Sequence, residues 1–326
     1  MSGWRAVGLA VLAAAGATAP YVFPSYVIGL LTLVLIAALF AASINLLAAG
    51  GLLSAGHAGI SAAAGYGLAY ATAHGAAWPE ALLVALLVTL VVAGLYALTS
   101  MRTATIYFLM VTLALGMVVF GLAYRLNTLT GGENGLRDVD RPPAVAEYWQ
   151  FYYLCLMALA VALVALWVIG RSPFGLALRG IRDSESRMRS LGYNVAAFKF
   201  QAVMLSGLLA GVSGVLATYQ AEFISPASAS FVRSALGLVM VILGGAGTLL
   251  GPLAGAAVVA LAQNELSVHM DRWQTALGLV FIAVVLFVPQ GLAGLGSRAA
   301  AMLRRAPRTR RTRGERQEEE EHAPSL

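Results

Sequence analysis

The residues best suited to catalysis or metal binding in this chain are few. Glu265, His269 and Asp271 lie close together near one end of an expected helix, where they could bind a metal ion or transfer a proton. The further ligands such a site needs are missing, and the sequence holds no HExxH motif and no paired acids within an apolar span. Cys155, the single cysteine, lies in an apolar helix and offers no disulfide or thiol-ligated metal. The sequence therefore predicts no catalytic residue and no metal site, and a membrane-embedded enzyme has almost no support.

A glycine-rich loop could in principle hold a phosphate. The loop that contains Thr130, Gly131, Gly132, Asn134 and Gly135 has no Lys-Ser/Thr after it and no buried strand before it, so it fails as a phosphate cradle. Its residue types favour tight turns instead. The formal net charge of +6 does not indicate nucleic-acid binding either, because the basic residues sit in loops and a tail that would face anionic lipid.

The one long polar segment between apolar spans is strongly basic. It runs over residues 171–199, and its charges are Arg171, Arg179, Arg182, Arg187, Arg189 and Lys199 against Asp183 and Glu185. Gly180 and Gly192 bracket a short helical stretch, which we expect over Ile181–Leu191. Such a helix on the inner face of a membrane protein could bind a soluble partner. The alternative is a solvated loop whose positive charge only fixes the topology.

Composition places the chain in a membrane. Hydrophobic residues make up 60% of its 326 residues and charged residues 11%, with a mean hydropathy of +0.80, whereas soluble domains have about 25% charged residues. Several apolar runs approach the roughly 20 residues that a helix needs to cross the hydrocarbon. They lack the alternation of membrane β-strands. We therefore predict an all-α integral membrane protein.

The apolar runs define the expected helices. They lie near residues 7–19, 27–48, 80–100, 105–124, 151–170, 200–221 and 274–288, together with a glycine-rich helix that follows residue 50. The run Ala235–Leu266 is interrupted by Gly244, Gly245 and Gly247 and could be one long broken span or two short ones. If the 171–199 loop and the arginine-rich tail both lie inside, the helix at 200–221 ends outside. An odd number of spans must then follow residue 232. Two spans for this run then give about ten transmembrane helices, with both termini cytoplasmic and residues 125–150 outside. Five basic residues are left outside: Arg125, Arg137, Arg141, Arg233 and Arg272.

In the glycine-rich stretch after residue 50, small residues recur at three- and four-residue spacing, which lets helix backbones approach closely in lipid. Its glycine density also suits an interrupted helix that faces a cavity. We assign Asn45, Ser54, Gly56 and His57 to a translocation path, together with the three glycines of the broken run. Two interpretations of His57 remain open. It could face the interior of the bundle, as intramembrane ionisable groups do, or it could lie at the membrane surface, bonded to a backbone carbonyl, which is the favoured interpretation.

The two ends of the chain differ in character. Residues 1–20 could pass for a cleavable signal peptide, but a retained anchoring helix is favoured. We expect one transmembrane domain over residues 1–297. The tail, residues 298–326, holds eight arginines and then Glu318–Glu321 without an apolar pattern, and is expected to be disordered and cytoplasmic.

A series of short motifs, in the order and spacing of one family, supports a more specific prediction. They are Ile44–Leu47 with Leu53–Ala58, Val111–Gly116, Thr130–Leu136, Gly175–Asn194, Phe223–Pro226, Gly244–Thr248 with Gly251-Pro252, and Gly291-Leu292. Together they resemble the LivM-type permease subunit of branched-chain amino acid ABC importers. The pattern departs at Arg187 and Met188, where family members usually have small residues.

The resemblance implies a function and a set of partners. The chain would pair with a LivH-like second permease, two ABC ATPase subunits and a periplasmic substrate-binding protein in the bacterial inner membrane. It would bind no cofactor itself, since ATP and Mg²⁺ would belong to the ATPases. A cytoplasmic coupling helix is expected at about Asp183–Asn194. The residues assigned to ATPase coupling are Arg182, Asp183, Glu185, Leu191, Gly192 and Asn194.

The substrate is less determined. Branched-chain amino acids are the family default, and related permeases carry urea, short amides or aromatic acids. The runner-up function is a self-sufficient channel or carrier for small neutral solutes such as urea or amides. The basic loop and the lack of coupling-ion ligands argue against it.

Overall fold

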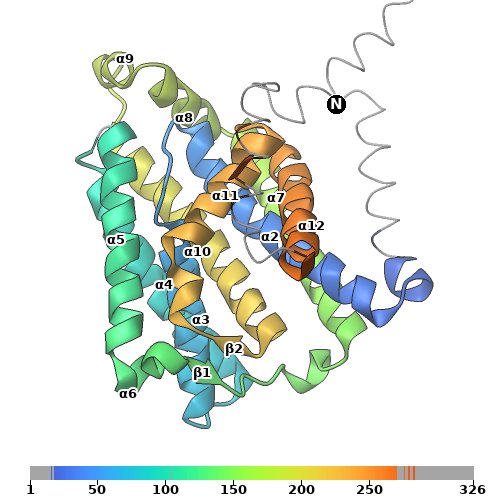
Figure 1. Cartoon of the computed structure of the whole chain (residues 1–326). Helices are drawn as coiled ribbons and strands as arrows, with labels where there is room; N and C mark the ends of the chain where they lie inside the picture. The colour runs from blue at the N-terminus through green and yellow to red at the C-terminus, as the bar shows by residue number, and fades with distance from the viewer. Residues whose placement is uncertain are drawn as a thin grey trace, which may run out of the picture.

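The computed structural model describes residue 16, residues 18–103 and 105–269, and the single residues 275, 278, 279 and 282. Over these ranges the chain is a bundle of long helices (Figure 1). The expected first helix, the last helix at 274–288, Gly291-Leu292, Asp271 and the charged tail lie largely or wholly outside the described residues.

The long helices follow the apolar runs closely. They are α2 (Ser25–Ala49), α3 (His57–Ala73), α4 (Trp78–Ser100), α5 (Thr105–Arg125), α7 (Tyr148–Arg171), α10 (Val195–Ala221), α11 (Phe231–Gly244) and α12 (Gly251–His269). Shorter elements join them: α6 (Asn127–Thr130), η1 (Gly132–Asn134), β1 (Leu136–Arg137), η2 (Pro143–Val145), α8 (Pro173–Asp183), α9 (Glu185–Ser190), β2 (Phe223–Ile224) and η3 (Pro226–Ala229).

Helix α2 lies at the centre of one half of the bundle, where it packs against α7, α10, α11 and α12. On the other side, α3, α4 and α10 pack against one another, and α5 covers α3. The C-terminal half of α2 is buried almost without interruption from Ala38 to Ala48. A helix that is apolar all round and enclosed by others needs no polar face.

Small residues set how closely these helices approach. At the start of α3, Gly56 lies against α5, and a methyl group added to Gly116 would come within 2.8 Å of the Gly56 Cα atom. Backbones pack this closely only where side chains are absent, as is typical of helices in membranes. The glycine density that the sequence showed after residue 50 thus serves helix packing.

The bundle has two distinct ends. One carries α8 and α9, which we call the basic end, and the other carries α6, β1 and β2, which we call the loop end (Figure 1). At the loop end β1 pairs antiparallel with β2, with Leu136 opposite Ile224 and Arg137 opposite Phe223. This short ladder links two loops, and the described residues form the all-α fold that the sequence predicted. Strands of two residues leave no alternation in the sequence by which they could be found.

The run Ala235–Leu266 forms two helices, as the charge count required. Helices α11 and α12 pack side by side and are joined by a turn at residues 245–250, located at the basic end. Gly245 has φ +106° and Gly247 φ +81°, backbone conformations that other residues rarely adopt. The glycines therefore make the reversal possible.

Five of the described helices, α2, α4, α5, α7 and α10, are long and apolar enough to cross a membrane. Helix α11 is apolar but has 14 residues, and α3 has 17. The described part of the chain is thus a multi-pass membrane bundle. The total of ten spans and the side on which the termini lie stay predictions.

Candidate functional site

Helix α8 lies on the basic end as an amphipathic helix. Ser172 caps its N-terminus by accepting a hydrogen bond from the Gly175 backbone N–H at 3.3 Å, and Pro173 occupies the first turn. Its buried residues, Gly175, Ala177, Leu178 and Ile181, recur at helical spacing. Leu178 packs beside Gly50, so α8 rests directly on the end of α2.

The expected coupling helix is not one helix. The chain breaks at Ser184, whose backbone is extended and whose hydroxyl accepts from the Arg187 N–H at 3.3 Å, so that a new helix, α9, begins at Glu185. The prediction of a single helix over Ile181–Leu191, or over Asp183–Asn194, is therefore wrong in its bounds. Serine competes for backbone hydrogen bonds and favours a cap over a helix interior.

Met188, which departs from the family pattern, anchors α9. Its side chain is buried with Ala177, Ile181 and Val195. The sulfur occupies the space beside Gly180, where an added methyl group would lie 2.7 Å from it. The lack of a side chain at Gly180 therefore leaves room for Met188, although the sequence suggested a helix boundary at this glycine.

A buried lysine ties α9 to the body of the bundle. Lys199, 3% exposed on α10, forms an ion pair with Glu185 of α9 and donates a hydrogen bond to the Thr103 carbonyl at 3.1 Å. Glu185 also contacts Arg189 at 3.4 Å. Charges this well enclosed are retained only when paired. The pair joins α9, α10 and the α4–α5 connection into one unit.

The residues assigned to ATPase coupling differ in exposure: some are held against the bundle and others project from it. Glu185 lies inward against Lys199, and Asn194 caps α10 by accepting from the Ala197 N–H at 3.1 Å. Arg182 is half exposed, lies along Gly51 and contacts Asp183 at 3.6 Å. Leu191 is 66% exposed, and the adjacent Gly192 has φ +84° with open space around it. The exposed tip is thus Arg187, Arg189 and the turn at 191–193.

Asn45 holds the turn between α11 and α12. Its side-chain oxygen accepts from the Gly247 N–H at 2.8 Å, and its amide nitrogen donates to the Thr248 carbonyl at 2.9 Å. Thr248 caps the start of α12 through the Gly251 N–H at 3.1 Å. Asn45 and Gly247 border a small hollow of about 200 Å³ beside Trp167 and Arg171. Asn45, the one amide side chain of α2, therefore connects this helix to the turn between α11 and α12.

Ser54, Gly56 and His57 lie inside the protein. His57 is 1% exposed, so the favoured interpretation that it sits at the membrane surface is wrong. Its Nε2 atom lies 3.2 Å from the Ser206 hydroxyl, which itself donates to the Ser43 carbonyl at 2.6 Å. The Oγ of Ser54 and the Nδ1 of His57 have no hydrogen-bond partner among the described residues.

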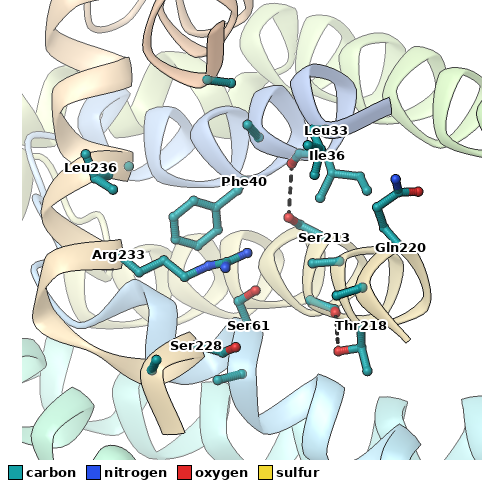
Figure 2. A pocket seen from close by; sticks show the side chains of 18 of the residues that line it. Leu33, Ile36, Phe40, Ser61, Ser213, Thr218, Gln220, Ser228, Arg233 and Leu236 are labelled. Atoms are coloured by element: carbon teal, nitrogen blue, oxygen red, sulfur yellow. Dashed lines mark hydrogen bonds between the residues drawn. The ribbon is translucent and has the colours of Figure 1, made fainter. Parts of the chain in front are cut away.

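A large cavity lies in the half of the bundle nearer the loop end. It measures about 760 Å³, within the range of small-molecule sites. It is bounded by α2, α3, α10, β2, η3, α11 and α12 (Figure 2). None of the residues assigned to the path lines it, Asn45, Ser54, Gly56, His57 and the three glycines included. Their role in a path stays a prediction.

Sequence reasoning assigned no residue of this cavity to a site, and the one that matters most chemically is Arg233. Arg233 was counted among outer-loop charges, but it lies in the first turn of α11 and its side chain extends into the cavity (Figure 2). The signal was present in the sequence: Ser230 is a good N-cap, so the helix that follows includes Arg233.

The predicted turn at Thr130–Gly135 forms a compact structure at the loop end. Thr130 donates to the Ala123 carbonyl at 2.6 Å and closes the end of α5. Gly131, Gly132 and Gly135 all have positive φ, and Gly135 lies against the Ile224 carbonyl. Through β1 and β2 this loop is linked to η3, whose Ala227 and Ser228 border the cavity.

Comparison with known proteins agrees with this architecture. Residues 26–289 match the profile of a family described as the permease component of branched-chain amino acid transport systems. The chain is 28% identical over 213 residues to the high-affinity branched-chain amino acid transport permease protein LivM of Salmonella typhimurium and of Escherichia coli, covering 57% of this chain and 50% of each relative. A nucleoside ABC transporter permease of Lactococcus lactis, NupC, is 38% identical over 60 residues, 18% of this chain and 19% of that one. The chain thus spans about half the length of the LivM proteins it matches.

Proposed function

The chain belongs to the family of branched-chain amino acid transport permease components, and on this premise we propose that it is the membrane-spanning subunit of an ATP-driven importer. It is a LivM-type, multi-pass protein of the bacterial inner membrane. Under the proposal it forms half of the translocation path beside a LivH-like permease. Two ATPase subunits would bind ATP and Mg²⁺, and a periplasmic binding protein would deliver the solute.

The observation that carries the proposal is the exposed tip of the basic end. Leu191 is 66% exposed and Tyr193 45% exposed, next to the cations Arg187 and Arg189. An exposed apolar side chain on a rigid, basic projection is typical of a protein-binding surface. We propose that this tip, α9 with residues 191–193, docks in a groove of the ATPase.

Contacts from the tip to the cavity suggest how the two would be coupled. The Lys199–Glu185 pair joins α9 to α10, and α8 rests on α2 through Leu178 and Gly50. Helices α2 and α10 both line the large cavity. Movement of the tip when the ATPases close would therefore tilt two of the cavity walls, because packed helices move as rigid elements.

We propose a branched-chain amino acid or a related small polar solute as the substrate. Support comes from the names of the relatives, which refer to branched-chain amino acid transport and, over a shorter match, to nucleosides. A self-sufficient channel or carrier for small neutral solutes remains the competing function, and it would need neither the tip nor an ATPase.

The docking role can be tested by co-purification of the ATPase with the permease from co-expressing cells. Leu191→Asp places a charge on the tip, and we expect at least a tenfold loss of bound ATPase. The matched control is Leu129→Asp, because Leu129 is 46% exposed at the opposite end of the bundle. Undiminished ATPase binding by Leu191→Asp, at wild-type permease levels in the membrane, would remove the tip from the docking site.

A further inference from the structure

The large cavity holds a positive charge without a partner. Arg233 is the one charged side chain among the described residues that line it. No described residue forms a hydrogen bond or ion pair with its guanidinium group. The backbone N–H of Arg233 donates to the Ser230 hydroxyl instead. Arg141, another arginine near the loop end, by contrast pairs with Glu222 and donates to the Tyr219 carbonyl.

An arginine within a membrane bundle is costly, and one that faces a cavity marks a binding site by default. Arg233 is accessible to solvent, and Figure 2 shows its side chain extending from α11 across the cavity, between Phe40 and Ser61. Guanidinium presents its donors as a planar fork that matches a carboxylate. The group is therefore placed to bind an anion that enters from the cavity.

The other polar side chains of the cavity complement the arginine. The Ser213 hydroxyl donates to the Ile36 carbonyl at 3.1 Å, and the Thr218 hydroxyl donates to the Gly214 carbonyl at 2.9 Å (Figure 2). A hydroxyl has one hydrogen, so both oxygens are left as acceptors. The site thus combines a cationic donor on α11 with acceptors on α10, a pattern that fits a carboxylate and an ammonium on one small molecule.

We propose that Arg233 is a specificity-determining residue that binds the carboxylate of the transported solute in this cavity. The inference rests on the proposed function and narrows it: solutes that carry a carboxylate are accepted, and analogues of the same shape with an uncharged carboxamide group in its place are rejected. Rejection follows because a neutral amide leaves the guanidinium desolvated and unpaired.

The test uses the complete transporter, with its second permease, ATPases and binding protein, in liposomes loaded with ATP. Uptake is measured for matched pairs, L-leucine with L-leucinamide and benzoate with benzamide. We expect Arg233→Gln to lower carboxylate uptake at least tenfold, and Arg233→Lys to retain part of it. The control is Arg125→Gln, the same charge change on an exposed residue at the loop end, with expected wild-type uptake.

A charge-restoration experiment covers the case in which Arg233→Gln fails to insert. Arg233→Cys is made in a Cys155→Ala background, since Cys155 is the only native cysteine and is buried. Treatment with 2-aminoethyl methanethiosulfonate forms a mixed disulfide that carries an ammonium, and sulfinate leaves. We expect this adduct to restore carboxylate uptake and the 2-sulfonatoethyl adduct to leave it low.

The outcomes separate the inference from the function on which it rests. If the wild type shows ATP-dependent uptake and Arg233→Gln matches Arg125→Gln, the importer stands and the role of Arg233 is overturned. Equal loss of carboxylate and amide uptake would also overturn it, and would indicate a structural role or a bound lipid phosphate. Solute movement without the ATPases would instead refute the proposed function.

Discussion

Lys199 of α10 and Glu185 of α9 form an ion pair whose lysine is almost completely enclosed, while the carboxylate remains 30% accessible. The two partners are therefore not equivalent. Loss of the carboxylate leaves an ammonium in the protein interior with the Thr103 carbonyl as its remaining recorded contact. Loss of the ammonium leaves a carboxylate that still reaches water and Arg189.

This asymmetry gives an ordered prediction for stability. We expect Glu185→Gln to destabilise the purified permease by about 3 kcal/mol, because an uncompensated buried charge is costly. Lys199→Met should cost about 1 kcal/mol, as for a partly exposed pair. Thermal unfolding in detergent should rank the midpoints wild type, Lys199→Met, Glu185→Gln. The double variant should be more stable than Glu185→Gln alone, and a reversed ranking would contradict the assignment.

The two side-chain hydrogen bonds of Asn45 are expected to keep the α11–α12 turn closed. Asn45→Ala removes the hydrogen bonds to the Gly247 N–H and the Thr248 carbonyl, each of which contributes about 0.5–1.5 kcal/mol. We expect the turn to open more often, so that a cysteine at Leu250 reacts faster with a maleimide. Ser43→Ala is the control, since the Ser43 hydroxyl on the same helix donates within α2, at 2.6 Å to the Phe40 carbonyl, and the substitution leaves the Ser43 backbone carbonyl in place. Equal labelling rates for Asn45→Ala and Ser43→Ala would show that the hydrogen bonds of Asn45 do not hold the turn closed.

Substitutions at two glycines of α5, Gly116 and Gly121, can distinguish the effect of close helix packing from the effect of helix propensity. Gly116→Ala would bring the new methyl group to 2.8 Å from the Gly56 Cα atom, whereas nothing lies within 4 Å of a methyl group at Gly121. Overpacking costs about 1–3 kcal/mol, while glycine-to-alanine in an open helix position gains about 0.5–1 kcal/mol. The unfolding midpoint should fall for Gly116→Ala and hold or rise for Gly121→Ala. Equal shifts would exclude close contact between α3 and α5.

The orientation of the bundle is tested by cysteine labelling of intact cells. In a Cys155→Ala background, Asn134→Cys at the loop end should react with an impermeant maleimide from outside. Arg187→Cys on α9 should react only after the membrane is made permeable. Both residues are exposed, so accessibility within the protein does not limit the reaction. The opposite pattern would place the basic end outside and would be incompatible with ATPase docking.

The fold was largely predictable because apolar length and glycine position carry the signal. Helices α2, α4, α5, α7 and α10 begin and end near the expected residues, and the charge count correctly divided the run around Gly245 into two helices. The break at Ser184 was missed, since a serine cap and a solvated serine look alike in sequence. His57 was misplaced because its burial depends on Ser206 and Phe40, which are distant in the chain.

The candidate site was less predictable for the same reason. Asn45 was selected as a path residue, but in the structure its side chain forms hydrogen bonds with Gly247 and Thr248. These residues are far from Asn45 in the chain, so no local sequence pattern indicates the contact. Arg233 was overlooked because charge counting treats every arginine near a loop as a topology signal. Only the packing of α11 against α2 and α3 shows that this arginine faces a cavity.

The central claim is that transport requires ATPases that dock at the tip of the basic end. The most direct measurement is L-leucine uptake into liposomes that contain the permease pair, with ATP inside and the binding protein outside, with and without the ATPase subunits, for wild type and Leu191→Asp. The account predicts uptake only when wild-type permease, ATPases and ATP are all present, and at least a tenfold loss for Leu191→Asp. Uptake by the permease without ATPases, unchanged by Leu191→Asp, would contradict it and establish a self-sufficient channel or carrier.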